Sequence, residues 1–143
     1  MRFLILNGPN LNRLGRRDSA QYGTGTYEEL CKLIGDTAAA GGDTAAFFQS
    51  NHEGALIDAI QQAAGRYDAI VINPGAYAHY SYALHDALLD SPLPAAEVHI
   101  SDIAAREPWR QVSVTAPACG VFIAGRGFEG YCAAMERLKE GTP

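Results

Sequence analysis

Phe3-Leu4-Ile5-Leu6-Asn7-Gly8-Pro9-Asn10 stands almost at the start of the chain and joins an apolar run to a polar loop. The run Phe3–Leu6 contains no polar residue, which is typical of a strand buried on both faces of a parallel sheet. We predict four further strands from the short apolar runs Thr44–Phe48, Ala69–Ile72, Ala95–Ile100 and Gly120–Ala124.

Helical patterns lie between these predicted strands. The first begins at Thr26, which forms a capping box with Glu29, and it ends at Gly41-Gly42. Apolar stripes predict the other helices at Leu56–Gly65, Ser81–Leu89 and Phe128–Leu138. The alternation of strands and helices predicts an α/β fold with a parallel sheet, right-handed crossovers and helices on both faces.

Length and charge limit the classes of function. The chain has 143 residues, which favours one domain, here residues 1–143. Its net charge of -5 argues against nucleic acid as a partner, because binding DNA or RNA usually needs a basic face. Arginines concentrate near the candidate site loops, which favours a small anionic substrate.

No signal peptide precedes Phe3 and no apolar run of about 20 residues occurs, so we expect a cytoplasmic protein without membrane contact.

The cysteines, Cys31, Cys119 and Cys132, are odd in number and include no Cys-x-x-Cys pair. This spacing excludes the usual zinc patterns and a disulfide framework. Each cysteine falls at an apolar position of the pattern, so we expect small buried hydrophobic side chains in a reduced protein.

Polar side chains collect where the predicted strands end. Ligands of open α/β sheets bind beyond the carboxyl ends of the strands, so these polar loops predict a pocket there. The residues concerned are Asn10, Arg17 and Tyr22 after the first strand, Gln49–Glu53 after the second, Asn73 and His79 after the third, and Glu97, His99, Ser101, Arg106 and Arg110 at the fourth.

The loop after the first strand, residues 7–23, is long and carries arginines close to Tyr22. Loops of more than about 12–15 residues are usually functional or disordered. An arginine beside the phenol would favour the phenolate, and an ionised tyrosine can abstract a proton. Arg17 and Arg16 compete for this place, and an ordinary surface tyrosine is the alternative.

Glu97 and His99 lie two residues apart on one predicted strand and therefore share a face, which Ser101 continues. Such a carboxylate can orient the imidazole and fix the position of its proton. A histidine satisfied by backbone groups is the alternative.

The other candidates have structural alternatives as well. Asn73-Pro74-Gly75 is by itself a turn motif. His79 can cap the following helix, and Arg106 and Arg110 can be solvated side chains.

Taken together, the ordered motifs of this chain resemble those of type II 3-dehydroquinate dehydratase, also called type II dehydroquinase. The resemblance spans nearly the whole chain. The matching segments are Asn7–Leu11, Leu14–Arg17, Tyr22-Gly23, Gln49–Gly54, Ile72–Pro74, His79, Glu97–Ser101, Arg106-Glu107, Arg110 and Gly125–Tyr131.

The resemblance implies a flavodoxin-like fold, a three-layer sandwich whose five-stranded parallel sheet has the order 2-1-3-4-5. It implies the removal of water from 3-dehydroquinate to give 3-dehydroshikimate, without a metal or a cofactor, in the shikimate pathway or in quinate breakdown. Tyr22 would be the base, kept ionised by Arg17, and Asn10 would hold a water that steadies the enolate. His99, positioned by Glu97, would be the acid that protonates the departing hydroxyl.

The same resemblance implies the substrate contacts and the assembly. The residues that would bind substrate are Asn73, Ile100 and Ser101 for the carboxylate, and His79, Arg110 and Asp86 for the ring hydroxyls. Asp86 would reach in from a neighbouring subunit, and Arg106 would support the site and a subunit contact. Family members are typically dodecamers built as tetramers of trimers, so we expect a homo-oligomer.

Several positions depart from the pattern of the family: Tyr80, His85, Asp102, Ala104, Trp109, Gln111 and Val112. None of them has a role in the reaction, but the surroundings of the site and the subunit interface can differ from the family norm. A lysine Schiff base, the other known dehydroquinase chemistry, is disfavoured because Lys32 and Lys139 lie on helical patterns away from the loops.

Two other classes of function stay open at this point. A flavin- or nucleotide-binding module can use the same fold, but no Gly-x-Gly-x-x-Gly follows the first strand, and Pro9 interrupts the amide groups that would bind a phosphate. A non-catalytic assembly protein on the same scaffold is the third possibility.

Overall fold

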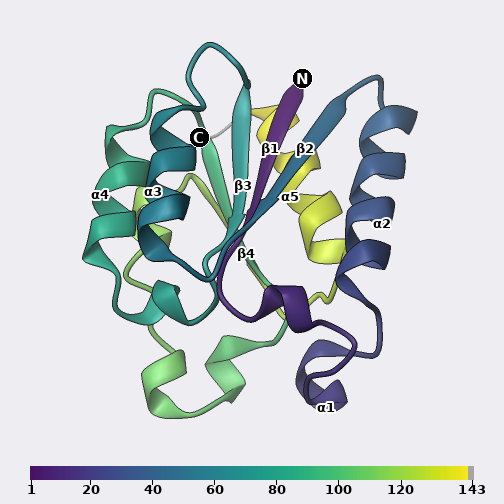
Figure 1. Cartoon of the computed structure of the whole chain (residues 1–143), viewed down its shortest axis with the longest axis vertical. Coiled ribbons are helices and arrows are strands. Elements are labelled where there is room, and N and C mark those ends of the chain that lie inside the picture. The colour runs from purple at the N-terminus through teal and green to yellow at the C-terminus, as the bar shows by residue number, and fades with distance from the viewer. Residues whose placement is uncertain (142–143) are drawn as a thin grey trace.

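One parallel sheet forms the centre of the molecule (Figure 1). Its strands are β1 (Arg2–Asn7), β2 (Thr44–Gln49), β3 (Ala69–Asn73), β4 (Ala95–His99) and β5 (Val121–Ala124). The five strands have the order β2-β1-β3-β4-β5, which confirms the predicted flavodoxin-like topology. This computed structural model describes residues 1–141. The sequence predicts fraying of residues 141–143, of which Thr142 and Pro143 lie outside the described part.

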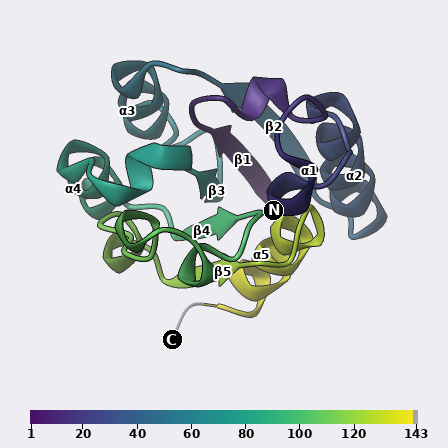
Figure 2. The same cartoon turned by 90° about the horizontal axis from the view of Figure 1, so that it is seen from below.

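Helices cover both faces of the sheet, as Figure 2 shows. The helices α2 (Tyr27–Ala40) and α5 (Glu129–Glu140) pack on one face, and α3 (Glu53–Gln61) and α4 (Tyr82–Asp90) pack on the other. The predicted three-layer arrangement is therefore confirmed. At the start of α2, the Thr26 hydroxyl accepts a hydrogen bond from the backbone N–H of Glu29 at 3.1 Å, as the capping box predicts.

Side chains of β1 alternate between the two halves of the core. Phe3 and Ile5 pack with residues of α2 and α5, whereas Leu4 and Leu6 pack with residues of α3 and α4. All four side chains are buried. The run of apolar residues that opens the sequence thus reflects a strand covered on both faces.

The long loop after β1 contains more regular structure than the sequence predicts. We expected no helical structure before Thr26, but a short helix, α1 (Ser19–Tyr22), forms in this loop and ends at Tyr22. The Asp18 side chain caps α1 by accepting a hydrogen bond from the N–H of Ala20 at 3.0 Å. Residues 102–119 form a second irregular stretch, which includes short 3₁₀ turns.

The loops that follow β1 and β3 touch at the carboxyl edge of the sheet. The N–H of Gly8 donates to the carbonyl of Asn73 at 2.8 Å. A Cβ atom on Gly8 would clash with the carbonyl group of Pro74, so glycine is required for this close approach. The contact fixes the spacing of two loops that carry candidate site residues.

The three cysteines are free, as expected for a reduced protein, but each is only partly buried, so the prediction of buried cysteine side chains is wrong. Among residues 1–141, no helix combines the length and the apolar character needed to cross a membrane.

Candidate active site

A pocket opens at the carboxyl edge of the sheet, near α1 and the 102–119 segment. Its wall brings together most of the predicted site residues, from loops that are far apart in the sequence. These residues are Asn10, Arg17, Tyr22, Asn73, His79, His99, Ile100, Ser101, Arg106 and Arg110. Apolar and backbone groups that the sequence did not single out complete the wall: Pro9, Leu11, Gly75, Ala76 and Ile103.

Two guanidinium groups meet at the phenol oxygen of Tyr22. Arg17 donates to this oxygen from Nη2 at 3.0 Å, and Arg106 donates from Nη1 at 2.7 Å. Arg16 is exposed, so the structure selects Arg17 as the neighbour that the sequence left undecided. The direct contact of Arg106 with Tyr22 was not predicted. Positive donors at this oxygen stabilise negative charge on it.

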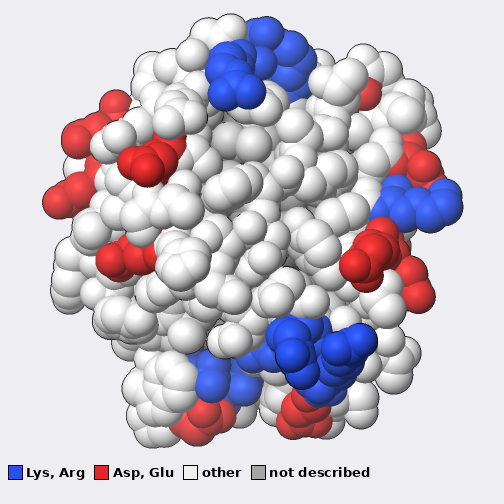
Figure 3. Space-filling view, in the orientation of Figure 1, with Lys and Arg blue, Asp and Glu red and all other residues white. Residues whose placement is uncertain are grey.

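The pocket is strongly basic. Burial lowers the pKa of the Arg17 guanidinium, the charge of Tyr22 opposes this effect, and the positive charges of Arg106 and Arg110 add to it. An arginine stays charged despite such a shift, so three cations face one small space. Figure 3 shows basic side chains gathered at the end of the molecule where α1 lies. An anionic ligand would relieve the repulsion among these groups.

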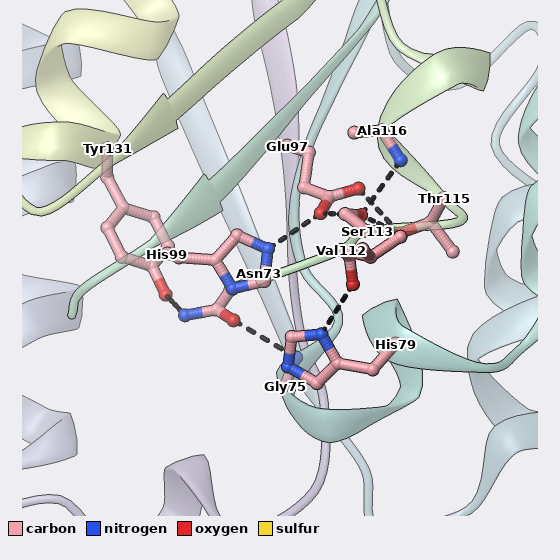
Figure 4. A network of polar contacts seen from close by, with 10 residues as sticks. All are labelled: Asn73, Gly75, His79, Glu97, His99, Val112, Ser113, Thr115, Ala116 and Tyr131. Carbon is pink, nitrogen blue, oxygen red and sulfur yellow. Dashed lines mark hydrogen bonds and ion pairs between the residues drawn. The ribbon is translucent and has the colours of Figure 1, made fainter. Parts of the chain in front are cut away.

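Glu97 and His99 form the predicted pair at the end of β4. His99 Nε2 lies 2.6 Å from Glu97 Oε1, and the Glu97 side chain is fully buried (Figure 4). Ser113 Oγ donates to the same Oε1 at 2.6 Å, and Thr115 Oγ1 donates to Oε2 at 2.6 Å. Both oxygens of this carboxylate act as acceptors, so His99 Nε2 donates to Oε1 and Nδ1 is left to exchange a proton with a ligand.

The sequence did not indicate that Ser113 and Thr115 are hydrogen-bond partners of Glu97. They lie 16 and 18 residues after Glu97, in the irregular segment before β5. Hydroxyl residues in a loop are common, and nothing in their local pattern distinguishes a partner of a buried carboxylate from a solvated side chain.

The structure selects between the alternatives for His79. Its Nδ1 lies 2.8 Å from the carbonyl of Val112, and since a carbonyl can only accept, Nδ1 carries the hydrogen. Burial lowers the pKa of His79, which favours the neutral ring. The cap of α4 is Ser81, whose hydroxyl accepts from the N–H of Leu84 at 3.0 Å. The suggestion that His79 caps this helix is therefore wrong.

Arg106 and Arg110 are not solvated side chains. The side chain of Arg106 is 11% exposed and that of Arg110 is 20% exposed. Arg106 also donates to the hydroxyl of Ser101 at 3.2 Å, and Arg110 is held by Glu107 at 2.7 Å. Both guanidinium groups are therefore placed at the pocket by specific partners.

Nearly the whole chain matches a family of known enzymes. The family model described as dehydroquinase class II matches residues 1–139. The chain belongs to the class II dehydroquinase family.

Relatives in this family are similar over nearly their full length. A 3-dehydroquinate dehydratase of Clostridium acetobutylicum is 50% identical over 139 residues, which is 97% of this chain and 96% of the relative. A 3-dehydroquinate dehydratase of Caldicellulosiruptor bescii is 52% identical over 138 residues, 96% of this chain and 95% of the relative. The crystal structure of a type II dehydroquinase from Butyrivibrio crossotus has a TM-score of 0.95 at 47% identity and covers 97% of both chains.

One further pocket residue of this class II dehydroquinase has an unusual backbone. Asn10 has a φ of 69°, the one positive value that a residue other than glycine shows within residues 1–141. Its N–H donates to Asn51 Oδ1 at 3.0 Å. Asn51 belongs to the predicted Gln49–Glu53 segment, which does not line the pocket but supports Asn10 from outside.

Asp86 does not line the pocket of its own chain. It lies on α4, where its side chain is 75% exposed. Its predicted contact with a neighbouring subunit therefore stays a prediction.

Proposed function

We propose that this protein removes water from 3-dehydroquinate to give 3-dehydroshikimate, as one catalytic domain. The names of its close relatives support this substrate. The observation that carries the proposal is the phenol oxygen of Tyr22 between the guanidinium groups of Arg17 and Arg106. This arrangement supplies the base that the reaction needs, in a basic pocket suited to a carboxylate substrate.

The reaction begins with the base. Tyr22, as a phenolate stabilised by Arg17 and Arg106, removes a proton from the carbon beside the ketone of the substrate. The electron pair of the broken C–H bond moves to the ketone oxygen and gives an enolate. Asn10, in its strained conformation at the wall of the pocket, holds a water that donates to the enolate oxygen.

The second half of the reaction expels the hydroxyl group. The enolate collapses to an enone, the C–O bond to the hydroxyl breaks, and His99 protonates the departing oxygen so that water leaves. The ionised Glu97 stabilises the positive charge of the imidazolium that this step requires. A proton then passes from Tyr22 to His99 through solvent and restores both groups.

Substrate binding uses the remaining side chains of the pocket. Asn73, Ser101 and the backbone of Ile100 bind the carboxylate, while His79 and Arg110 bind ring hydroxyls. The neutral state of His79 leaves Nε2 as an acceptor for a hydroxyl hydrogen, because Nδ1 donates to Val112.

The proposed assembly is a dodecamer built from trimers. Tyr82, Asp86 and Leu89 follow one another at helical spacings of four and three residues, so they share a face of α4. Tyr82 is 69% exposed and Leu89 is 61% exposed. Large apolar side chains on both sides of Asp86 support a subunit contact that brings this carboxylate to the pocket of a neighbour.

The role in metabolism follows from the same proposal. The product belongs to the shikimate pathway or to quinate breakdown, and the cytoplasm is the expected location. The steps above use side chains and water alone, so we expect turnover without a metal or a cofactor.

An absorbance assay tests the proposed activity. Purified protein mixed with 3-dehydroquinate should produce a rising ultraviolet absorbance from the conjugated enone, and a chelator should not change the rate. The Tyr22→Phe variant should lose turnover by a factor of at least about 10² while it still binds substrate. A Tyr67→Phe variant, altered at a loop before β3, serves as the matched control. A wild-type protein without turnover, or a fully active Tyr22→Phe variant, would contradict the proposal.

A further inference from the structure

Behind the pocket, Asn73 belongs to a cluster of buried polar side chains whose other members have no role in the proposed reaction. Asn7 at the end of β1, Asn73 at the end of β3 and Tyr131 on α5 are each at most 4% exposed. Asn7 and Asn73 are register partners on adjacent strands. Burying polar groups costs free energy unless they are paired, so a phenylalanine at position 131 would be the simpler core residue.

The hydrogen bonds of this cluster have one consistent direction. The hydroxyl of Tyr131 donates its single hydrogen to Asn7 Oδ1 at 2.6 Å, so it can only accept from Asn73 Nδ2, at 3.0 Å. Burial raises the pKa of Tyr131, which keeps this hydroxyl protonated as a donor.

This direction fixes the side-chain amide of Asn73. Its Oδ1 accepts from the N–H of Gly75 at 3.1 Å, while its Nδ2 points to Tyr131 (Figure 4). A flipped amide would place an NH₂ group against the N–H of Gly75 and an oxygen against a hydroxyl that has no hydrogen left to give. The amide of Asn73 therefore has one allowed orientation.

Asn73 also belongs to the wall of the pocket. An amide nitrogen has two hydrogens, and Tyr131 takes one of them. We propose that Tyr131 is a positioning residue, which acts through Asn73 to present the second amide hydrogen to an oxygen of an anionic substrate. This inference rests on the proposed function and adds to it a residue of α5 that does not itself line the pocket.

The Tyr131→Phe variant removes the hydroxyl and keeps the ring. Without its acceptor the Asn73 amide can flip or tilt, so the KM for 3-dehydroquinate should rise about tenfold, the equivalent of one hydrogen bond, while kcat changes less than about twofold. Tyr67→Phe removes a hydroxyl from a partly buried tyrosine that packs in the other half of the core, and it should leave both constants unchanged. A loss that is only structural would instead lower the active fraction, and with it kcat, at constant KM.

A double-mutant cycle tests whether Tyr131 affects substrate binding through Asn73 or by another route. Tyr131→Phe should raise KM in the wild-type background but have no further effect in an Asn73→Ala background. An equal rise of KM in both backgrounds, or none in either, would overturn the inference.

A second variant keeps the test decisive if Tyr131→Phe does not fold. Asn7→Leu removes the acceptor of the Tyr131 hydroxyl and should raise KM in the same way; an unchanged KM would overturn the inference. If the wild type lacks turnover, the proposed function fails and this inference falls with it. If the wild type and Tyr67→Phe are active and KM in Tyr131→Phe is unchanged, the inference alone fails.

Discussion

At the scale of single residues, the chemistry of the site depends on side chains that hold other side chains. Tyr22 has its two guanidinium donors, and Glu97 has Ser113 and Thr115. Residue type and local spacing predicted Tyr22 and the Glu97–His99 pair, but they left Arg16 and Arg17 as competing neighbours of Tyr22, and only the resemblance to a family favoured Arg17. The sequence did not predict that Arg106 reaches Tyr22, because the two lie 84 positions apart and their contact depends on the fold.

Thr115 tests how far Glu97 depends on its hydroxyl donors. Thr115→Val keeps the shape but removes the donor to Glu97 Oε2, so a buried carboxylate loses a hydrogen bond. We expect kcat to fall about tenfold because the charge beside His99 is less well stabilised. Steady-state kinetics over a range of pH values measure this effect. Thr44→Val, at the exposed start of β2, is the control, and equal kcat values for the two variants would contradict the expected role.

At the scale of elements, the strands were predictable to within one residue at each end, because each coincides with a short run rich in apolar residues. The helix α1 was not predictable. It has four residues, too few for a periodic pattern, and it forms where Asp18 caps it and Arg17 and Arg106 hold Tyr22. The element that carries the proposed base is therefore defined by tertiary contacts.

Gly8 tests the contact between the loops after β1 and β3. Gly8→Ala places a methyl group against the carbonyl of Pro74, and because backbone cannot move aside cheaply, we expect a loss of stability of roughly 1–3 kcal/mol. The displaced loops should also raise KM. Gly54→Ala is the matched control, because an added Cβ at Gly54 meets no atom within 4 Å. Denaturant unfolding measures the stability of both variants, and we expect a lower midpoint for Gly8→Ala than for Gly54→Ala. Equal midpoints would refute the steric argument.

An ion pair between Arg2 and Asp68 joins the starts of β1 and β3, and its contribution to the stability of the fold depends on pH. Hydrogen bonds from the Arg2 side chain and backbone lower the pKa of Asp68 from 3.8 to about 2. Because the pKa of Asp68 is lower in the folded protein than in the unfolded chain, its carboxylate stabilises the fold at pH values above 3.8. This stabilisation is lost as the pH falls through about 2. Asp68→Asn should therefore have a lower unfolding midpoint than the wild type at pH 7. The difference should vanish below pH 2; a difference that persists there would exclude the electrostatic cause.

At the scale of the whole molecule, the strand order followed from the resemblance to a family, and the structure confirms it. Composition and periodicity alone predict an α/β fold but do not order the strands, because several orders satisfy the same alternation. The arrangement of subunits was likewise inferred from the resemblance. The face of α4 around Asp86 is exposed in the single chain, and the subunit contact at this face stays a prediction.

Subunit mixing tests the proposed role of Asp86 in a neighbouring site. Asp86→Ala and Tyr22→Phe should each have low activity when pure. Mixed oligomers, formed by refolding the two variants together, should regain activity, because a Tyr22→Phe subunit can lend its intact Asp86 to a neighbour with an intact Tyr22. Mixtures no more active than the separate variants would show that Asp86 does not serve a neighbour, and light scattering reports whether oligomers formed.

The proposed function rests on two guanidinium groups that donate to the Tyr22 oxygen, and we propose that Arg17 and Arg106 thereby keep Tyr22 ionised in the resting enzyme. The most direct test is the ultraviolet difference spectrum between the wild type and Tyr22→Phe at neutral pH. We expect the absorbance of one phenolate per subunit in the wild type and its loss in the variant. A spectrum in which Tyr22 contributes only as a neutral phenol at neutral pH would contradict this proposal.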